Sequence, residues 1–283
     1  MAGFALKYSS TAAIRAPGTS PILFKGDLCS SIIKSKNYGF DAVEIHIRRP
    51  DEIEIDKINE YCFKNNITIS TIGTGMSYVI DRLSLTDLNW QKRKMAIERL
   101  KGYIDLAEKL NSGVIIGSMR GKIDFDNYNK HLSVYRENIL ELTDYAEYKD
   151  VPIYLETINR YEVNFHNTIE EMADFLSSIN SSRLKILIDT FHMNIEEADM
   201  EESIKKYGNY VGHVHFADSN RRYPGKGHIS FRGIINALIE IGYEGYIAFE
   251  YLPYPDPDTA AKKGLDYLLA IEKSIAAKEN LLL

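Results

Sequence analysis

Short apolar runs alternate with longer amphipathic segments along almost the whole chain. Eight runs have the length and composition of buried strands: GFALKYS (3–9), DAVEIHI (41–47), ITISTIG (67–73), GVIIGSM (113–119), VPIYLET (151–157), LKILIDT (184–190), YVGHVHFAD (210–218) and GYIAFEY (245–251). Between them, apolar residues recur at helical spacing, most clearly in 91–110 and 128–148, and more weakly in 29–37, 52–65, 168–179, 199–207, 231–241 and 258–277. The alternation predicts repeated βα units.

These units predict a single domain over residues 1–283, an α/β fold in which eight strand–helix pairs form one closed (β/α)8 TIM barrel. No low-complexity linker or change of composition divides the chain. An open doubly wound sheet is the alternative, but no glycine-rich phosphate loop opens any of the predicted helices. The longest interruption, residues 74–90, follows the third strand and is a candidate lid over the carboxyl ends of the strands.

The composition narrows the functional classes. Lys and Arg total 34 against 40 Asp and Glu, and the net charge of −6 opposes binding to a phosphate backbone, so we expect no nucleic acid partner. No apolar stretch approaches the length of a membrane span, and the start of the chain lacks a secretory pattern, which predicts a cytoplasmic protein without a membrane partner. Cys29 and Cys62 have neither a disulfide-like nor a metal-thiolate spacing.

Four metal-competent residues stand at or near the ends of the last four predicted strands: Glu156, Asp189, His215 and Glu250. In a barrel, the carboxyl ends of the strands carry the chemistry. A carboxylate buried there costs several kcal/mol unless a cation or a hydrogen-bond partner compensates it. Three acids and one imidazole suit a hard or borderline divalent ion, with Mn²⁺ preferred and Mg²⁺ or Co²⁺ as alternatives.

Other polar residues near the strand ends have less decisive interpretations. His213 points inward like His215, either as a packed core histidine or as support for the site. His192 lies just past a strand end, where it can meet a substrate oxygen or solvent. Glu44 and His46 lie on one face of the second strand, as pocket residues or as a packing pair.

Four segments resemble a known family: LETINRYE (155–162), DTFHMNIEE (189–197), GHVHFADSNRRYPGKGH (212–228) and AFEYLP (248–253). They are similar to the ketose 3-epimerases of the xylose-isomerase-like barrel superfamily, which include D-tagatose/D-psicose 3-epimerases and 5-keto-gluconate epimerases. The resemblance is strong through 151–255, whereas the first half agrees mainly in its strand pattern.

The resemblance implies a reaction and a role for each site residue. Glu156, Asp189, His215 and Glu250 would bind the metal, and the two glutamates would also act as the acid/base pair. An unphosphorylated ketose or keto-sugar acid would be inverted at C3 through an enediolate, because two facing carboxylates remove and return the proton on opposite sides. Three residues would contact substrate oxygens: Glu162, His192 and Arg221.

Arg120 is a candidate for substrate selection. It follows the fourth strand in GSMRGK (117–122), a segment that resembles the 5-keto-gluconate epimerase branch. An arginine there would meet a substrate carboxylate. A solvated loop residue and a salt-bridge partner are the alternatives.

Three other functions share this scaffold or its residues. Hydroxypyruvate or inosose-type isomerases and dehydratases use the same barrel, so fold alone does not choose among them. A metal-dependent abasic-site endonuclease needs a richer metal cluster than this sequence offers, and a noncatalytic sugar-binding barrel would not exchange the C3 proton. The family resemblance also implies a homo-oligomer, a dimer or tetramer, with the apolar tail 279–283 as a candidate contact.

Overall fold

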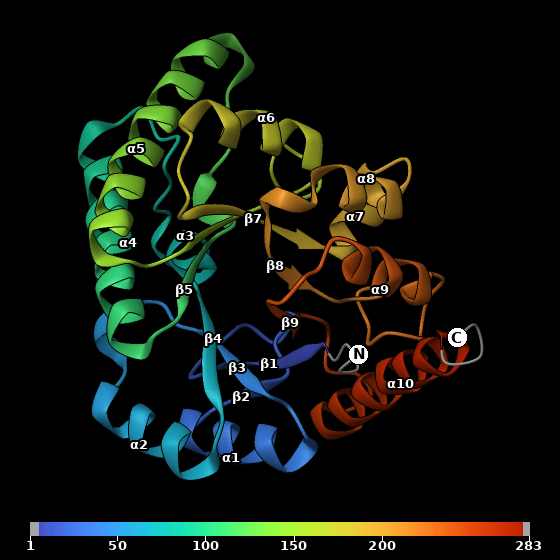
Figure 1. Cartoon of the computed structure of the whole chain (residues 1–283). Coiled ribbons are helices and arrows are strands. Elements are labelled where there is room, and N and C mark those ends of the chain that lie inside the picture. Colours follow the sequence, from blue (N-terminus) through green and yellow to red (C-terminus); the bar gives the residue numbers. More distant parts are fainter. Residues whose placement is uncertain (1–5, 280–283) are drawn as a thin grey trace.

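Parallel strands form a barrel that helices surround, as the computed structural model shows for residues 6–279 (Figure 1). The strands are β1 (Lys7–Ala13), β2 (Phe24–Lys25), β3 (Ala42–His46), β4 (Thr68–Gly73), β5 (Gly113–Ile116), β6 (Ile153–Glu156), β7 (Leu184–Asp189), β8 (Val211–His215) and β9 (Tyr246–Phe249). The helices are α1 (Leu28–Tyr38), α2 (Ile55–Asn65), α3 (Gly75–Asp81), α4 (Trp90–Leu110), α5 (Tyr128–Lys149), α6 (Ile169–Ile179), α7 (Thr190–Glu196), α8 (Met200–Tyr207), α9 (Phe231–Glu240) and α10 (Pro257–Glu279).

The pairing of β1 with β9 closes the barrel. The strands follow one another in the order β1, β3, β4, β5, β6, β7, β8 and β9, and Lys7 to Ser10 of β1 then pair with Tyr246 to Phe249 of β9. The short strand β2 continues this edge, because it pairs with β1 beyond the end of β9. The predicted closed TIM barrel is therefore confirmed, and the open sheet is wrong.

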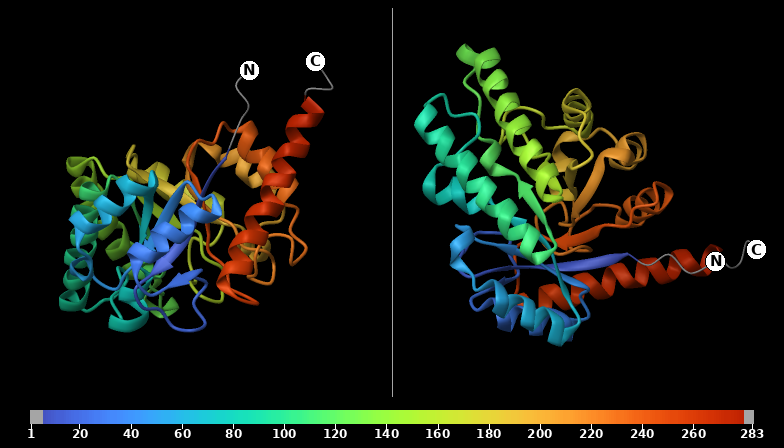
Figure 2. Two further views of the ribbon diagram at one scale, coloured as in Figure 1. Left: turned by 90° about the horizontal axis from the view of Figure 1, so that it is seen from below. Right: turned by 60° about the vertical axis from the view of Figure 1, so that its left-hand side comes forward.

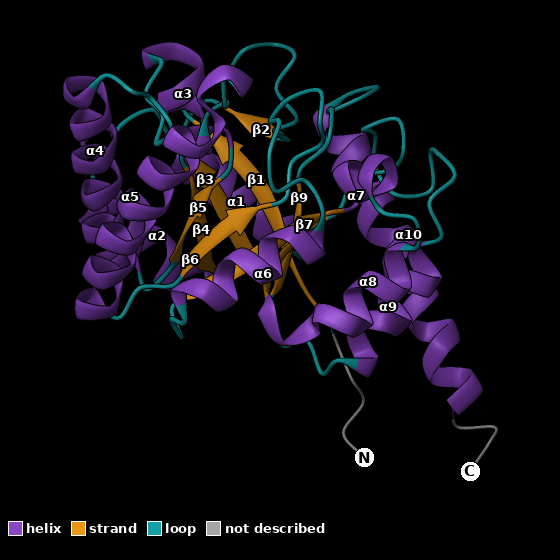
Figure 3. Ribbon diagram, turned by 90° about the horizontal axis from the view of Figure 1, so that it is seen from above, coloured by secondary structure: helices purple, strands orange, loops and turns teal. Residues whose placement is uncertain are grey.

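Helices cover the outside of the barrel, and several of them begin at a side-chain cap. In Figure 3 the orange strands lie inside a ring of purple helices, and in Figure 2 α10 runs along β1, where Tyr8 Oη donates to Glu272 Oε1 (2.5 Å). Thr168 and Glu171 form a reciprocal capping box at the start of α6. Within residues 6–279, no helix has both the length and the apolarity that a bilayer crossing requires.

The first strand differs from its prediction. The expected strand 3–9 begins outside the described residues, and β1 continues to Ala13 through Ser9, Ser10 and Thr11. All three side chains are buried, and each hydroxyl has a hydrogen-bond partner, such as Ser35 Oγ at 2.6 Å from Ser10 Oγ. A strand predicted from apolar residues alone ends too early here, because hydrogen-bonded hydroxyl groups take the place of apolar side chains in the core.

The segment 74–90 contains the short helix α3, which the sequence pattern did not reveal. Its two ends are tied to the barrel: Thr74 Oγ1 donates to Ile115 O (2.7 Å), and Leu85 N donates to Met119 O (2.9 Å). The proposed function of this segment as a lid stays a prediction. The tail residues 280–283 lie outside the described part of the chain.

Thr11 offers a test of how the barrel is closed. Its hydroxyl donates to Phe249 O (2.8 Å) and accepts from Leu23 N (3.0 Å), so it joins β1, the segment before β2 and β9. We expect Thr11→Val to leave both main-chain groups unpaired and to lower the free energy of unfolding by about 2–4 kcal/mol in urea titrations. Thr143→Val is the matched control, because the buried Thr143 hydroxyl has no partner to lose, and its change should stay below about 1 kcal/mol. Equal losses in the two variants would contradict this role.

Candidate metal centre

Four side chains from the ends of consecutive strands converge at one mouth of the barrel. Asp189 on β7 is the direct register partner of His215 on β8, which in turn pairs with Ala248 on β9. Glu250 follows two residues later, and the register of β6 on β7 gives Glu156 the same orientation. Paired residues of neighbouring strands, and residues two apart in one strand, point to the same side of a sheet. All four side chains therefore point into the barrel.

These four residues form a compact, buried cluster. One ligand atom from each lies within 4.8 Å of the others. Glu156, Asp189 and His215 are buried, and the Glu250 side chain is 13% exposed. Asp189 also caps α7, because its Oδ1 accepts from Phe191 N (2.7 Å). Its other oxygen, Oδ2, is left facing the cluster.

Burial and nearby charges give the three acids of the cluster different pKa values. Burial, with the charge of Glu250, raises the pKa of Glu156 well above its usual value. Burial likewise raises the pKa of Asp189 to about 7, against the effect of Arg221. Burial would also raise the pKa of Glu250, but His215 and Arg221 outweigh it and lower this pKa to about 2. The two glutamates therefore favour opposite protonation states.

The cluster fits a divalent cation. Within the described residues 6–279, two of its buried atoms, Asp189 Oδ2 and His215 Nδ1, have no hydrogen-bond partner. Unpaired buried polar atoms are costly and call for a missing partner. Carboxylate oxygens with one imidazole nitrogen are the donor set of Mn²⁺, Mg²⁺ or Co²⁺ sites. A metal site is thus supported by the geometry, and its residues remain a proposal.

The three predicted substrate contacts border this cluster. His192 Nε2 lies 3.6 Å from Glu156 Oε1, and its Nδ1 is 2.7 Å from Asn159 Nδ2. The Asn159 amide also donates to Glu162 Oε1 (3.0 Å). Arg221 lies opposite and donates to Glu250 Oε2 (2.9 Å) and to Glu162 Oε1 (3.3 Å). The structure thus brings together residues that are far apart in sequence.

Asp218 holds the loop that carries Arg221, a role that the sequence reading did not assign. Its buried carboxylate accepts from the main-chain N–H groups of Ser219 (2.8 Å), Gly225 (2.9 Å) and Ile229 (3.2 Å). The Arg221 guanidinium also stacks over a ring, that of Phe191, at 4.7 Å from its centroid. The arginine is therefore fixed from two sides.

Arg120 lies in the protein interior. It is fully buried, and its guanidinium donates to the main-chain oxygens of Glu156, Phe165 (2.6 Å) and His166 (3.1 Å). It also stacks over the Phe165 ring at 4.7 Å. The solvated-loop alternative for Arg120 is therefore wrong. Contact with a substrate carboxylate stays a prediction, and these occupied donors count against it.

Glu44 is the centre of a second buried group below the cluster. His46 Nε2, His213 Nε2 and Thr71 Oγ1 lie 2.8, 2.7 and 2.5 Å from its carboxylate oxygens. The Nε2 atom of His215 is 3.1 Å away. Burial would raise the Glu44 pKa, but His215 and the other histidines outweigh it and hold this pKa well below its usual value. The sequence shows that Glu44 and His46 are two positions apart on one strand, but it does not show that His213 on β8 is their neighbour.

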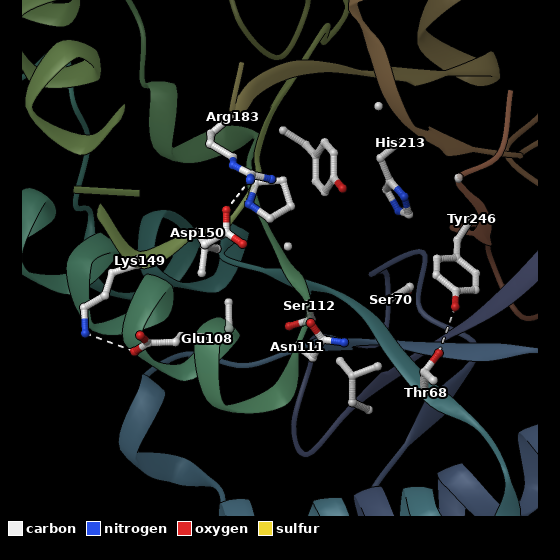
Figure 4. A pocket seen from close by; sticks show the side chains of 18 residues that line it. Thr68, Ser70, Glu108, Asn111, Ser112, Lys149, Asp150, Arg183, His213 and Tyr246 are labelled. Atoms are coloured by element: carbon white, nitrogen blue, oxygen red, sulfur yellow. Dashed lines mark hydrogen bonds and ion pairs between the residues drawn. The ribbon is translucent and has the colours of Figure 1, made fainter. Parts of the chain in front are cut away.

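A polar cavity of about 540 Å³ opens at the opposite end of the barrel, where the strands begin (Figure 4). Its wall includes Thr68, Ser70 and Tyr246, with the Tyr246 and Thr68 hydroxyls 3.0 Å apart. Two ion pairs, Arg183 with Asp150 and Lys149 with Glu108, line one side. His213 also lines the cavity, on the side of Tyr246 (Figure 4). This cavity is separate from the cluster, since strand beginnings and strand ends face opposite ends of a barrel.

Comparisons with known proteins agree with the geometry. A family model described as a xylose isomerase-like TIM barrel matches residues 32–271. D-psicose 3-epimerase from Ruminiclostridium cellulolyticum is 33% identical over 77% of this chain and 76% of that protein. The enzyme of the same name from Enterocloster bolteae is 46% identical over 40% of this chain and 38% of that protein. The chain belongs to the xylose isomerase-like TIM-barrel family.

Solved structures of this family have the same architecture. The crystal structure of D-psicose 3-epimerase with D-tagatose from Clostridium cellulolyticum H10 matches 94% of this chain and 99% of that chain, with a TM-score of 0.80 and 26% identity. Relatives that match 75–78% of the chain are 3-epimerases. The predicted family and the predicted enzyme class, a carbohydrate epimerase or isomerase, are confirmed.

Metal binding should release protons from this family member. At pH 6.5 most Asp189 side chains hold a proton, because burial raises the pKa of this carboxyl to about 7, and a cation that binds Oδ2 must displace that proton. The apparent Mn²⁺ affinity should therefore rise from pH 6 to pH 8. Calorimetric titrations in two buffers of different ionisation enthalpy would show the release, and Glu240→Gln on the surface should release the same number. A binding heat that is independent of the buffer would contradict this charge state.

Gly117 should be required for the position of Glu156. A Cβ atom at Gly117 would lie 2.1 Å from Glu156 Oε2, closer than any real contact allows. We expect Gly117→Ala to displace the carboxylate and to weaken Mn²⁺ binding by roughly 10-fold or more, as other disturbances around metal ligands do. Gly18→Ala is the control, because nothing lies within 4 Å of its added Cβ. Unchanged binding in Gly117→Ala would contradict the requirement for this space beside the Glu156 carboxylate.

Proposed function

We propose that this chain is a divalent-metal-dependent epimerase that inverts C3 of an unphosphorylated ketose or keto-sugar acid. The observation that supports it most directly is the position of the two glutamates. Glu156 and Glu250 come from β6 and β9, the outer strands of a four-strand arc, and they flank Asp189 and His215 from the inner strands. Inversion needs an acid and a base on opposite faces of the reacting carbon.

The opposite pKa shifts of the glutamates give each a role. Glu250, which is ionised, accepts the proton as the C3–H bond breaks and the electron pair moves toward the C2 carbonyl oxygen. Glu156, which is protonated, then donates its proton to the other face of C3, and the electron pair returns to form the inverted C–H bond. The protonation states of the pair are exchanged after one turnover, which suits the reverse reaction. The bound cation supplies stabilisation of the negative charge on the substrate oxygens.

Neighbouring polar groups position the sugar and the acids in this proposal. The three residues Glu162, His192 and Arg221 present donors and acceptors beside the acid/base pair. The Arg221 contact with Glu250 also keeps this carboxylate ionised before the proton is removed. We assign these residues to substrate hydroxyl and carbonyl oxygens. Arg120 is left out, because it is fully buried and both of its terminal guanidinium nitrogens donate to main-chain oxygens.

The remaining finer assignments rest on the sequence pattern and the donor set, and the oligomer rests on the family resemblance. We propose Mn²⁺ as the resident cation, a homo-oligomeric and cytoplasmic enzyme, one domain over residues 1–283, and a lid role for 74–90. Proposals for the substrate follow the relatives, whose names include D-psicose, L-ribulose and ketose 3-epimerases. An isomerase or dehydratase on the same scaffold is the alternative function, because two glutamates serve those reactions as well.

Deuterium exchange tests the proposal directly. The Mg²⁺-loaded enzyme in D₂O, with psicose, fructose, tagatose or 5-keto-gluconate, should place deuterium at C3 and form the C3 epimer, as followed by NMR. Excess chelator should abolish both signals. We expect Glu156→Gln and Glu250→Gln each to lower kcat by about 100-fold or more, since each removes one proton-transfer group.

A surface variant serves as the control, and two results would contradict the proposal. Glu240→Gln, on the surface, should keep full activity, because Glu240 pairs only with Lys205 at 3.1 Å. Deuterium at C1 or loss of water, without C3 inversion, would move the chain to the isomerase or dehydratase group. Full activity in the presence of chelator would overturn the metal-dependent mechanism.

A further inference from the structure

Glu44 is a buried carboxylate that no step of the proposed reaction uses. It has no solvent exposure and lies in the inward layer of β3, across the barrel from β8. Its neighbours are three imidazoles and one hydroxyl, from His46, His213, His215 and Thr71. An ionised group in such a place needs a compensating environment, because burying an unpaired charge is costly.

Two interpretations fit this set of residues, and the distances decide between them. Glu44, His213 and His215 have the composition of a second metal site. Two ligand atoms on one tetrahedral zinc ion would lie about 3.3 Å apart, since each is about 2.0–2.1 Å from the metal. The Glu44 oxygens are only 2.8 Å from His46 Nε2 and 2.7 Å from His213 Nε2. These are hydrogen-bond distances.

Direct hydrogen bonding also satisfies the carboxylate completely. A carboxylate has about four acceptor positions, and four donors surround Glu44. The Thr71 hydroxyl donates to Oε2, and the N–H groups of the imidazoles occupy the other positions. Three of these contacts fall on Oε2 and one falls on Oε1, so hydrogen-bond partners meet both oxygens of Glu44.

The contact with His215 links this group to the metal centre. The Nε2 atom of His215 is 3.1 Å from the Glu44 carboxylate, so its proton is on Nε2. In the neutral imidazole that binds a cation, the other nitrogen, Nδ1, therefore carries the free lone pair, and it is the unpartnered atom beside Glu250 Oε2 at 3.7 Å. A hydrogen bond at one imidazole nitrogen fixes both the tautomer and the ring orientation at the other.

We propose that Glu44 is a positioning residue, which holds the His215 ring and tautomer so that Nδ1 is presented to the divalent cation. The inference rests on the proposed metal-dependent function. His213 contributes by anchoring the same carboxylate from the layer below. Gly73 leaves the space that this arrangement needs, because a Cβ there would lie 2.4 Å from His46 Nδ1.

Metal binding by the apo-protein tests this role without relying on activity. We expect Glu44→Gln to keep one Mn²⁺ site per chain and to weaken it by about 10- to 100-fold in calorimetric titrations, as changes behind metal ligands do. The amide replaces one acceptor by a donor, which opposes the N–H groups around it. The visible spectrum of the Co²⁺-loaded variant should also change, since His215 is no longer held in one orientation.

Glu272→Gln is the matched control. Glu272 also accepts hydrogen bonds inside the fold, from Tyr8 Oη (2.5 Å) and Leu6 N (3.3 Å), but it lies on α10, outside the barrel. This variant should lower the melting temperature and leave Mn²⁺ affinity within about 2-fold. If Glu44→Gln does not fold, Thr71→Val removes one donor to Glu44 and should give a smaller loss of affinity, about 3-fold.

Each contrary outcome has a distinct meaning. Wild-type affinity in Glu44→Gln, or in Thr71→Val where the first variant does not fold, would overturn the positioning role. Two Mn²⁺ ions per wild-type chain, with one lost in Glu44→Gln, would make Glu44 a ligand of a second ion and would also overturn it. Failure of the wild-type chain to bind any divalent cation would instead remove the proposed metal-dependent function, and this inference with it.

Discussion

The proximity of three carboxyl groups in a buried space is the constraint on which the rest of the site depends. Their ligand atoms lie within 4.8 Å of one another together with His215, at a depth where water does not screen them. The chain compensates for this repulsion with Arg221, with the charge of His215 and with two unpaired atoms that fit a cation. The register of β6 to β9 fixes the positions of these groups, so the geometry of the cluster depends on the assembly of the barrel.

Strand patterns made most of the barrel predictable from the sequence. Seven strands and the long helices were found near their predicted positions, because buried parallel strands read as apolar runs. The meeting of the four candidate ligands was also predictable, since Glu156, Asp189 and His215 each stand at or near the end of such a run. The β1 strand was displaced in the prediction, because Ser9 and Ser10 are core residues through their hydrogen bonds.

Residues whose partners are distant in sequence were harder to assign. Nothing near Arg120 in sequence indicates that the carbonyl oxygens of Glu156 and Phe165 will occupy its guanidinium. Glu44 likewise reads as one member of a strand pair, and only the closed barrel brings it to His213, 169 positions away. The spacing of apolar residues predicts which face of its own strand or helix a side chain occupies. It does not predict which strand lies across the barrel from that side chain.

The polar groups of the site lie on two kinds of chain segment, strands and loops. The four candidate ligands are borne by strands or follow them directly, whereas Glu162 and Arg221 come from loops that Asn159 and Asp218 organise separately. Loops tolerate substitution and insertion better than a closed sheet does. Under the proposed function, substitutions in these loops would change the surface that faces the sugar and would leave the candidate ligands on the strands in place, so that one barrel could serve different sugars.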